Sequence, residues 1–312
     1  MEIFLRSISG ILVILGMILV GFVIGEKGWF DDKSRGLIAK LVTQIALPCY
    51  MLYTITQRFT AADLLKMLPA LRFPALSMVI LLGIATAVAR IFAVRQDRRG
   101  LFISMFFNSN TIFVGLPINQ ALFGDDSIPY VLIYYMCNTT FFWTLGTYLI
   151  QRDGEGEARF DLKTSLKKVF SPPLMGFLLG LVLVMLQIKL PAFLASDLQY
   201  LGNLTTPLSM IFIGLSVSHV GVKQLVLGKD QLLILLGRFL VAPLLMATIV
   251  YWAPLPSLMK QVFIIQSAMP VMTNAPVVAK LYGADSDYAA VMVTETTLAT
   301  MVVIPILMVL MA

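Results

Sequence analysis

The sequence predicts an all-α, polytopic membrane protein with ten transmembrane helices in two inverted five-helix repeats. Three observations predict this fold: the composition, a series of long apolar segments, and prolines and glycines that recur at one spacing. Of the 312 residues, 59% are hydrophobic and only 13% are charged, and the mean hydropathy is +0.89. Soluble domains carry about 25% charged residues. The chain therefore has too little charge to cover a water-soluble surface.

The charged, cysteine and histidine residues exclude several classes of function. The net charge of +6 reports membrane topology rather than nucleic-acid binding, because Lys and Arg concentrate in cytoplasmic loops. Cys49 and Cys137 lie in apolar segments and have neither metal-ligand nor disulfide-framework spacing. His219 is the single histidine, too few for a multi-histidine metal site. We therefore expect no metal, no cofactor and no nucleic-acid partner, and we expect the lipid bilayer around the chain.

A helix that spans the bilayer needs about 20 apolar residues, and on this measure the chain divides into ten segments. They cover approximately residues 4–25, 37–56, 73–94, 102–122, 129–150, 172–190, 204–222, 231–252, 261–281 and 288–311. No basic stretch precedes the first segment and no clean cleavage site follows it, so we interpret it as a retained helix. The longest joint is polar and divides the chain. The prediction is a first repeat at 1–150, a short cytoplasmic linker at 151–170 and a second repeat at 171–312.

The distribution of Lys and Arg predicts the orientation. With the N-terminus outside, the inner joints and helix ends hold 16 basic residues and the outer ones hold six, Arg6, Arg58, Lys66, Arg72, Lys189 and Lys260. Lys and Arg resist translocation. We therefore expect a multi-pass protein of the cell membrane with both termini extracytoplasmic.

Recurring prolines and glycines indicate that the two halves are related. Pro48 and Pro207 are 159 residues apart, as are Pro117 and Pro276, and Gly124 lies 159 residues before Gly283. Because five helices per repeat is an odd number, the second repeat enters the membrane in the opposite orientation. This arrangement is typical of secondary transporters, which bind substrate near the membrane midplane beside interrupted helices.

The fourth and ninth segments carry the candidate site. They read Phe107-Asn108-Ser109-Asn110-Thr111-Ile112-Phe113-Val114-Gly115-Leu116-Pro117 and Gln266-Ser267-Ala268-Met269-Pro270-Val271-Met272-Thr273-Asn274-Ala275-Pro276. Proline removes a backbone donor and clashes with the preceding turn, and freed backbone groups in a membrane must line a cavity or find partners. The helix portion after each break would aim its partly positive N-terminus at the break, which favours an anionic substrate. The candidate binding residues are Asn108, Asn110, Gly115, Pro117, Thr273, Asn274 and Pro276; the alternative is a pair of proline kinks patched by Asn side chains.

Four short motifs, in this order, resemble the auxin efflux carrier family, which includes plant auxin exporters and bacterial permeases for small organic acids. They are Ala46-Leu47-Pro48, Asn108-x-Asn110 through Gly115-Leu116-Pro117, Thr206-Pro207-Leu208 through Gly214, and Met269-Pro270 through Asn274-Ala275-Pro276. The resemblance covers almost the whole chain. It implies that segments four and nine cross at their breaks, that segments 1, 2, 6 and 7 form a scaffold, and that segments 3–5 and 8–10 form a moving transport domain. Plant members carry a long cytosolic loop after segment five that this chain lacks, so neither its phosphorylation nor auxin as substrate carries over.

Two ionisable residues, Arg238 and Glu295, fall inside predicted helices. Charges there are costly and are functional candidates by default. Each lies seven residues after the inner start of its segment, at Gln231 and Tyr288, so both are about 10 Å deep at 1.5 Å per residue. Three alternatives remain open: a structural ion pair, an Arg238 that binds the substrate anion, and a Glu295 that titrates during transport.

Further polar and small residues fit two interpretations each. Asn138-Thr139-Thr140 and Thr294-x-Thr296-Thr297 either face the breaks or form interhelical hydrogen bonds. Gly21-x-x-x-Gly25 and Gly176-x-x-x-Gly180 permit close helix packing within one chain or between two copies, so a homodimer is one alternative.

The leading prediction is a secondary transporter, not an enzyme, that moves a small organic anion by alternating access. The family resemblance points to carboxylates such as malate or malonate. An alternative is a sodium- or proton-coupled symporter of the bile-acid-transporter type, since Asn, Thr and carbonyl oxygens could bind a cation. A channel is less favoured because paired breaks are typical of alternating access. No Ser-His pair, paired intramembrane carboxylates or metal cluster supports an enzyme.

Overall fold

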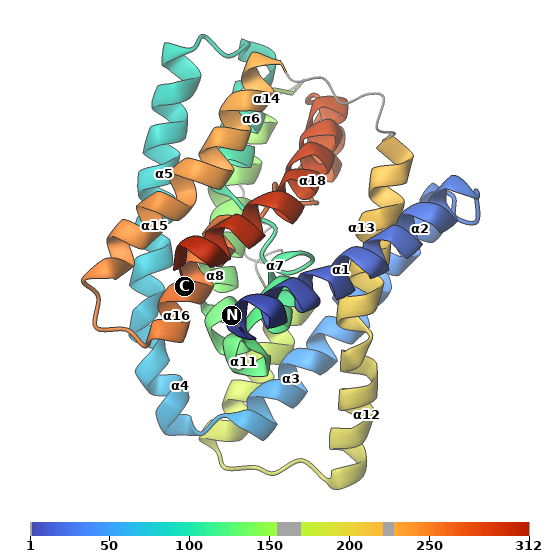
Figure 1. Cartoon of the computed structure of the whole chain (residues 1–312), viewed down its shortest axis with the longest axis vertical. Coiled ribbons are helices and arrows are strands. Elements are labelled where there is room, and N and C mark those ends of the chain that lie inside the picture. Colours follow the sequence, from blue (N-terminus) through green and yellow to red (C-terminus); the bar gives the residue numbers. More distant parts are fainter. Residues whose placement is uncertain (1, 155–169, 221–227, 312) are drawn as a thin grey trace. The chain divides into compact units, whose positions relative to one another are not determined.

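The computed structural model describes residues 2–154, 170–220 and 228–311, so most of the predicted linker at 151–170 lies outside the described residues. The described chain is built of helices joined by short turns and contains no strand (Figure 1). Five helical segments are long and apolar enough to cross a membrane: Lys33–Arg58, Ala61–Ile91, Ala192–His219, Lys229–Tyr251 and Ser286–Met311. The predicted all-helical class is confirmed.

Several helical segments have boundaries that differ from the predicted spans, and three of them illustrate the differences. The third begins at Ala61, where Thr60 and Asp63 form a reciprocal capping box, and it continues to Ile91. The seventh is preceded by a helix at Ala192–Asn203, and the sixth ends at Met185. A count of apolar residues misses the two added starts because the first carries the charged residues Asp63 and Lys66, and the second carries Asp197 with the amide side chains Gln199 and Asn203.

The chain divides into two compact units. The first, which we call the break unit, comprises the described residues of Met1–Leu12, Ala70–Leu166 and Val220–Ala312. Its helices are α5 (Arg72–Ile91), α6 (Arg99–Phe107), α7 (Gly115–Phe123), α8 (Ile128–Phe141), α9 (Thr147–Gln151), α14 (Lys229–Leu236), α15 (Ala242–Tyr251), α16 (Ser257–Ser267), α17 (Ala275–Tyr282) and α18 (Ser286–Met311). Two π-helical turns, Phe142–Gly146 and Gly237–Val241, connect α8 to α9 and α14 to α15.

The second unit comprises Val13–Pro69 and the described residues of Lys167–His219. It contains most of α1 (Glu2–Glu26) and of α13 (Thr205–Val220), with α2 (Asp32–Leu41), α3 (Leu47–Arg58), α4 (Ala61–Met67), α11 (Pro172–Met185) and α12 (Ala192–Asn203). A Cβ atom on Gly21 of α1 would overlap the backbone of Ile211 in α13, and one on Gly176 of α11 would overlap that of Pro48 in α3. Both glycine motifs are therefore used for helix packing within the chain.

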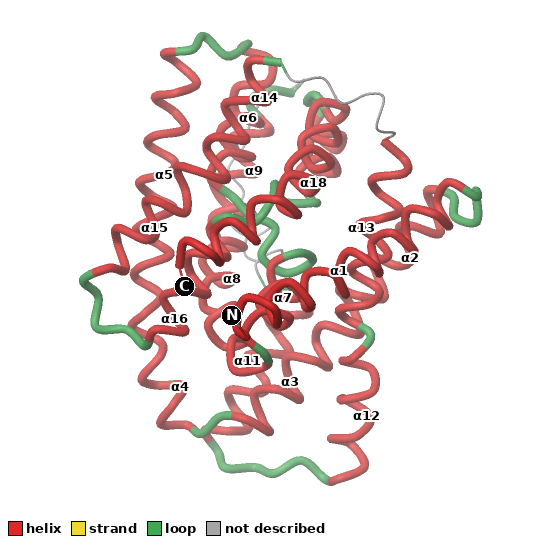
Figure 2. The backbone as a smooth tube through the Cα atoms, viewed as in Figure 1, coloured by secondary structure: helices red, strands yellow, loops and turns green. Residues whose placement is uncertain are grey.

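The break unit contains two interrupted helical segments. α6 ends at Phe107 and α7 begins at Gly115, and α16 ends at Ser267 and α17 begins at Ala275. We call residues 108–114 the first break and residues 268–274 the second break; Figure 2 shows the chain leaving the helices there. We call α6 and α16, which precede the breaks, the proximal half-helices, and α7 and α17, which follow them, the distal helices. Both distal helices end at a glycine with positive φ, 72° at Gly124 and 74° at Gly283, a conformation that glycine adopts without a clash because it has no Cβ atom.

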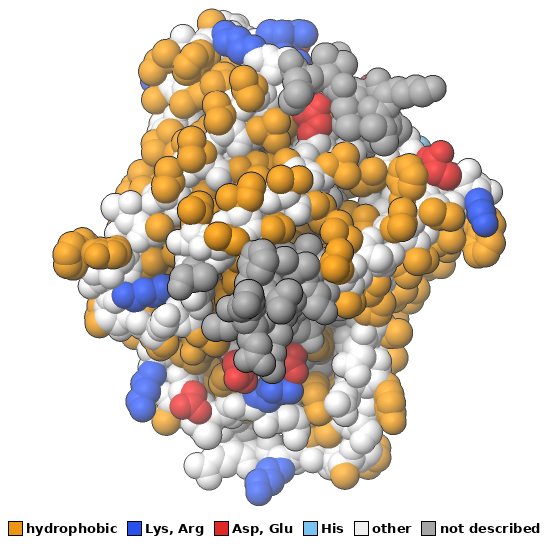
Figure 3. All heavy atoms as spheres, in the orientation of Figure 1, with side chains coloured by type: hydrophobic (Ala, Val, Ile, Leu, Met, Phe, Trp, Pro, Cys, Tyr) orange, Lys and Arg blue, Asp and Glu red, His pale blue; other side chains and the backbone are white. Residues whose placement is uncertain are grey.

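Hydrophobic side chains cover the outer face of α14 and α15 in the break unit (Figure 3). Leu232, Leu236, Leu240 and Leu244 recur every four residues and are 44–59% exposed. Residues four apart lie on one side of a helix, so these leucines form a continuous apolar stripe. A stripe of this kind suits contact with lipid.

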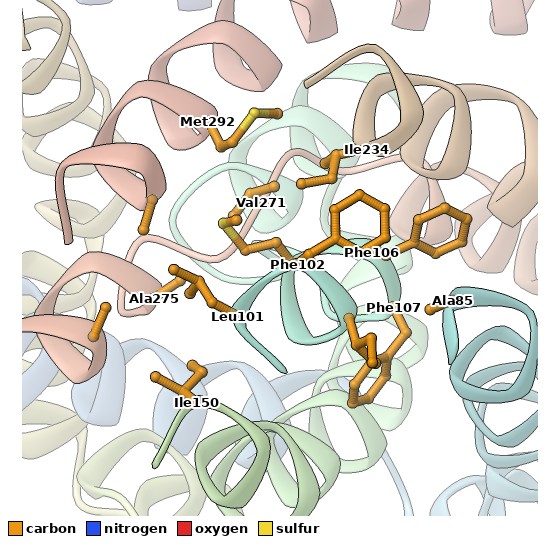
Figure 4. Close-up of a cluster of buried hydrophobic side chains, with 14 of the residues drawn as sticks. Ala85, Leu101, Phe102, Phe106, Phe107, Ile150, Ile234, Val271, Ala275 and Met292 are labelled. Atoms are coloured by element: carbon orange, nitrogen blue, oxygen red, sulfur yellow. The ribbon is translucent and has the colours of Figure 1, made fainter. Parts of the chain in front are cut away.

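The core of the break unit packs around α6. Phe102, Phe106 and Phe107 of α6 are at most 2% exposed and belong to one buried cluster with Ile234 of α14 and Met292 of α18 (Figure 4). Val271 of the second break belongs to the same cluster and is fully buried. The non-helical backbone of the second break is therefore built into the core.

Candidate functional site

The two breaks are joined to each other inside the break unit. Ser109 and Val271 form an isolated antiparallel β-bridge, and the amide of Asn110 donates to the carbonyl of Pro270 over 2.8 Å. The side-chain amide of Asn110 also donates to Oγ1 of Thr273 over 2.9 Å. Backbone that leaves a helix inside a membrane must find polar partners, and here each break supplies partners to the other.

A helix that follows each break supplies further hydrogen bonds. Asn138 of α8 accepts from the amide of Ser109 at 2.9 Å and donates to its carbonyl at 2.7 Å. Thr296 of α18 accepts from the amide of Val271 at 3.0 Å. Asn138 and Thr296 therefore face the breaks, which is the first of the two interpretations given to these polar clusters.

Gln266 is a site residue that sequence reasoning missed. Its side-chain amide, fully buried near the end of α16, donates to the carbonyl of Thr111 in the first break over 3.3 Å. A Cβ atom on Gly115 would overlap the end of the Gln266 side chain, so these two residues are in close contact. The signal in the sequence was an amide side chain directly after the apolar run 262–265.

Arg238 binds the C-terminal ends of both proximal half-helices. It lies in the π-helical turn between α14 and α15 and is fully buried. Its guanidinium donates to the carbonyl of Phe106 at 3.1 Å, to that of Ser267 at 2.5 Å, and to that of Met269 at 3.0 and 2.9 Å. The last carbonyls of a helix lack intrahelical partners and carry the negative end of its dipole. One cation thus caps α6 and α16 together.

Gly237 makes this position of Arg238 sterically accessible. A Cβ atom on Gly237 would overlap the ring of Phe106, with its Cδ2 atom 2.6 Å away. Without the Cβ atom, the π-helical turn lies directly against α6, and the guanidinium reaches the Phe106 carbonyl.

Arg238 and Glu295 are both buried, at 0% and 7% exposure, as the predicted intramembrane positions require. The four hydrogen bonds of Arg238 to described residues all end on backbone carbonyls. Carbonyl binding at the half-helix ends is a role for Arg238 that the sequence-based alternatives did not include. Substrate binding by Arg238 and titration of Glu295 stay predictions.

The predicted binding residues differ in their surroundings. Asn108 is 1% exposed and donates to the Ser104 carbonyl of the preceding helix α6 at 3.2 Å, and Asn110 is 3% exposed. Thr273 and Asn274 of the second break are half-buried, so they are more accessible than the first break.

The two prolines lie in the first turns of the distal helices. Pro117 is the third residue of α7 and Pro276 is the second residue of α17. Proline is tolerated in a first helical turn, where its missing N–H has no partner in any case. The prolines therefore lie just after the breaks, which are formed by the seven residues that precede each distal helix.

Comparison with known proteins matches the chain to membrane transporters. An uncharacterized transporter of Methanocaldococcus jannaschii is 27% identical over 299 residues, which cover 94% of this chain and 95% of that protein. An uncharacterized transporter of Methanothermobacter thermautotrophicus is 27% identical over 312 residues, with coverage of 97% and 98%. The model of the Mem_trans family, described as membrane transport protein, matches residues 7–308. The chain therefore belongs to this membrane transport family, which is of the auxin efflux carrier type that its motifs predicted.

Proposed function

We propose that this membrane transporter is a secondary carrier that moves a small organic anion by alternating access and binds it at the two joined breaks. The observation that carries the proposal is the junction itself. Two interrupted segments from separate halves of the chain meet at Ser109 and Val271, and Arg238 caps both of their proximal half-helices. Interrupted helices of this kind form substrate sites in secondary transporters.

The balance of charge around the junction favours an anion. A helix end carries about half an elementary charge, negative at the C-terminus and positive at the N-terminus. The C-terminal ends of α6 and α16 together supply about one negative charge, which the single positive charge of Arg238 offsets. The N-terminal ends of α7 and α17, which begin where the breaks end, then contribute about one positive charge. With Glu295 protonated, this excess would attract a carboxylate.

The second break offers polar side chains that a carboxylate can reach. Thr273 and Asn274 are half-buried, and amide and hydroxyl groups can donate hydrogen bonds to an oxyanion. Asn110 bonds to Thr273, so the first break sets the orientation of this hydroxyl. We assign substrate binding to Asn110, Thr273 and Asn274, with Asn108 and Gly115 as supports for the first break.

The division into two units supports a mechanism with a moving part. Both breaks and Arg238 belong to the break unit, whereas α2, α3, α11 and α12 belong to the second unit. We assign the break unit as the transport domain and the second unit as the scaffold, in two inverted repeats. Rigid-body motion of one bundle against another around a fixed site is a common form of alternating access.

Uptake into proteoliposomes tests the proposal. Reconstituted protein is supplied with radiolabelled malate or malonate outside, with and without sodium and with and without an inward proton gradient; protein-free liposomes and the Thr273→Val variant are the controls. We expect saturable, sodium-independent uptake that Thr273→Val reduces. No uptake of any of a panel of mono- and dicarboxylates would contradict an organic-anion carrier. Electrical flux far above carrier turnover would indicate a channel.

Proton-coupled symport is the second candidate, and one observation favours it. Glu295 is a buried carboxyl group on α18 directly before Thr296, whose hydroxyl binds the second break. Protonation of Glu295 would thus occur next to a residue that holds the site. In this mechanism a proton gradient stimulates uptake by the parent protein and not by Glu295→Gln; equal stimulation of both would exclude Glu295 as the coupling group.

A further inference from the structure

A polar cavity of about 430 Å³ lies at the end of the break unit where α5 ends, α6 begins and α9 ends. Small-molecule sites commonly measure about 300–1,000 Å³. Its lining includes three arginines, Arg90, Arg99 and Arg152, together with the neutral polar side chains of Thr86 and Gln96 and the carboxylate of Asp153. None of these residues takes part in the junction of the breaks.

All three arginines retain donors for a ligand. Arg99 uses Nε and Nη2 to bind the carbonyl of Val94, at 3.3 and 3.1 Å, so three of its five N–H donors stay available. Arg90, in the last turn of α5, and Arg152, directly after α9, are exposed, and their side chains form no hydrogen bond or ion pair with the residues that the structure describes. Arginine presents its donors in a planar fork that matches the oxygens of a phosphate group.

The single carboxylate of the lining is committed to the protein backbone. Asp153 accepts from the amides of Gly100 at 2.9 Å and Leu101 at 2.6 Å, both in the first turn of α6. A Cβ atom on Gly100 would overlap the Leu149 carbonyl of α9, so glycine is needed for this approach. The lining therefore holds three cations and one anion, a net charge of +2, and its one carboxylate already neutralises the N-terminus of α6.

We propose that this cavity binds a phosphate group, carried by a free phosphate compound or by the headgroup of an anionic phospholipid. A phosphate group bears up to two negative charges near neutral pH, which matches the charge of the lining. The phospholipid source has structural support, because Ile91 and Phe92 directly after Arg90 are 75% and 43% exposed. These apolar side chains beside the cavity suit contact with acyl chains.

The test uses the full chain in detergent and in nanodiscs. Binding of inorganic phosphate is measured by isothermal titration calorimetry, and retention of phosphatidate against phosphatidylcholine is measured by native mass spectrometry. The variants are Arg90→Gln and Arg152→Gln, whose side chains are exposed. Arg72→Gln is the matched control, because Arg72 is an exposed arginine at the opposite end of α5, about 27 Å from Arg90 at 1.5 Å per residue.

We expect one saturable phosphate or phosphatidate site per chain, weakened at least about tenfold in Arg90→Gln and in Arg152→Gln and unchanged in Arg72→Gln. Binding of inorganic phosphate shows that a free phosphate compound suffices; retention of phosphatidate without binding of inorganic phosphate assigns the site to a lipid headgroup. Two outcomes would overturn the proposal: neither probe binds, or the three variants weaken binding equally. Thermal unfolding without ligand verifies that each variant is folded.

Discussion

The side-chain amide of Asn110 donates a 2.9 Å hydrogen bond to the hydroxyl of Thr273, and the two residues are 163 positions apart in the chain. Asn110 also accepts from the amide of Phe113 at 3.2 Å. One amide side chain therefore fixes the turn of the first break and orients the accessible hydroxyl of the second. Replacing Asn110 should therefore alter both the turn of the first break and the position of the Thr273 hydroxyl in the second break.

Replacing Asn110 should weaken substrate binding. Asn110→Ala removes the partner of Thr273 and of the Phe113 amide, and leaving buried polar groups unsatisfied costs about 1–3 kcal/mol. We expect a loss of this size in the free energy of carboxylate binding, measured by calorimetry. Thr140→Val is the control, because Thr140 is exposed and its hydroxyl bonds within its own helix. Affinity within error of the parent would show that Asn110 lies outside the binding site.

The prolines after the breaks should be needed for transport. Pro117→Ala or Pro276→Ala removes a fixed φ and restores a backbone donor, which lets the distal helix extend into its break. We expect lower uptake at unchanged membrane insertion. Pro305→Ala is the matched control, because Pro305 lies inside α18, away from both breaks. Parental uptake rates in both break variants would contradict this role.

Arg238 should stabilise the break unit through the carbonyls and not through an ion pair with Glu295. Arg238→Gln leaves carbonyls of Phe106, Ser267 and Met269 without their donor, so we expect a loss of unfolding free energy on the order of 3 kcal/mol. In a double-mutant cycle with Glu295→Gln, the effects should add to within about 0.5 kcal/mol. Recovery of stability in the double variant would instead demonstrate an ion pair.

A conservative variant, Arg238→Lys, addresses the role of Arg238 in substrate binding when carboxylate affinity is measured beside thermal stability. If Arg238 only holds the half-helices, Arg238→Lys keeps the buried positive charge and part of the hydrogen bonding to the carbonyls. If the guanidinium contacts substrate, a lysine variant of parental stability would still lose carboxylate affinity.

Glycine at position 237 should be essential for packing against α6. Gly237→Ala forces a methyl group onto the Phe106 ring, and overpacking of a core costs about 1–3 kcal/mol. Gly83→Ala is the control, because nothing lies within 4 Å of its Cβ position in the described chain and alanine favours a helix over glycine. Thermal unfolding should rank Gly237→Ala below the parent and Gly83→Ala at or above it. The reverse order would mean that the π-helical turn moves freely away from α6.

Burial raises the pKa of Asp153 above its ordinary value of 3.8, while hydrogen bonds from Leu101 and Gly100 act in the opposite direction. A folded-state pKa above the unfolded value means that the folded chain binds more protons. The contribution of Asp153 to stability is therefore fully present below its ordinary pKa and is lost as pH rises through the raised pKa. Unfolding followed from pH 3.5 upward should show this decline in the parent and a weaker one in Asp153→Asn; identical pH profiles would contradict it.

The sequence alone determined the class of the protein, its family and the position of its breaks. Low charge and long apolar segments require a membrane environment. Inside a membrane, a helical segment satisfies its own backbone hydrogen-bonding groups, so these segments are expected to be helices. The segments around Asn108–Pro117 and Met269–Pro276 were identifiable because proline and amide side chains are unusual within apolar helices. Gly124 and Gly283 marked the ends of both distal helices, because a positive φ is a local requirement that glycine meets.

Tertiary structure decided which groups meet at the breaks. The pairing of Ser109 with Val271 and the bond from Gln266 to Thr111 join residues more than 150 positions apart, and no local pattern encodes such a register. Depth along a helix suggested a partner for Arg238, but depth leaves the direction of the side chain around the helix undetermined. The π-helical turn and the absence of a side chain at Gly237 direct the guanidinium to the carbonyls of two broken helices, and that choice depends on the packing of α14, α6 and α16 together.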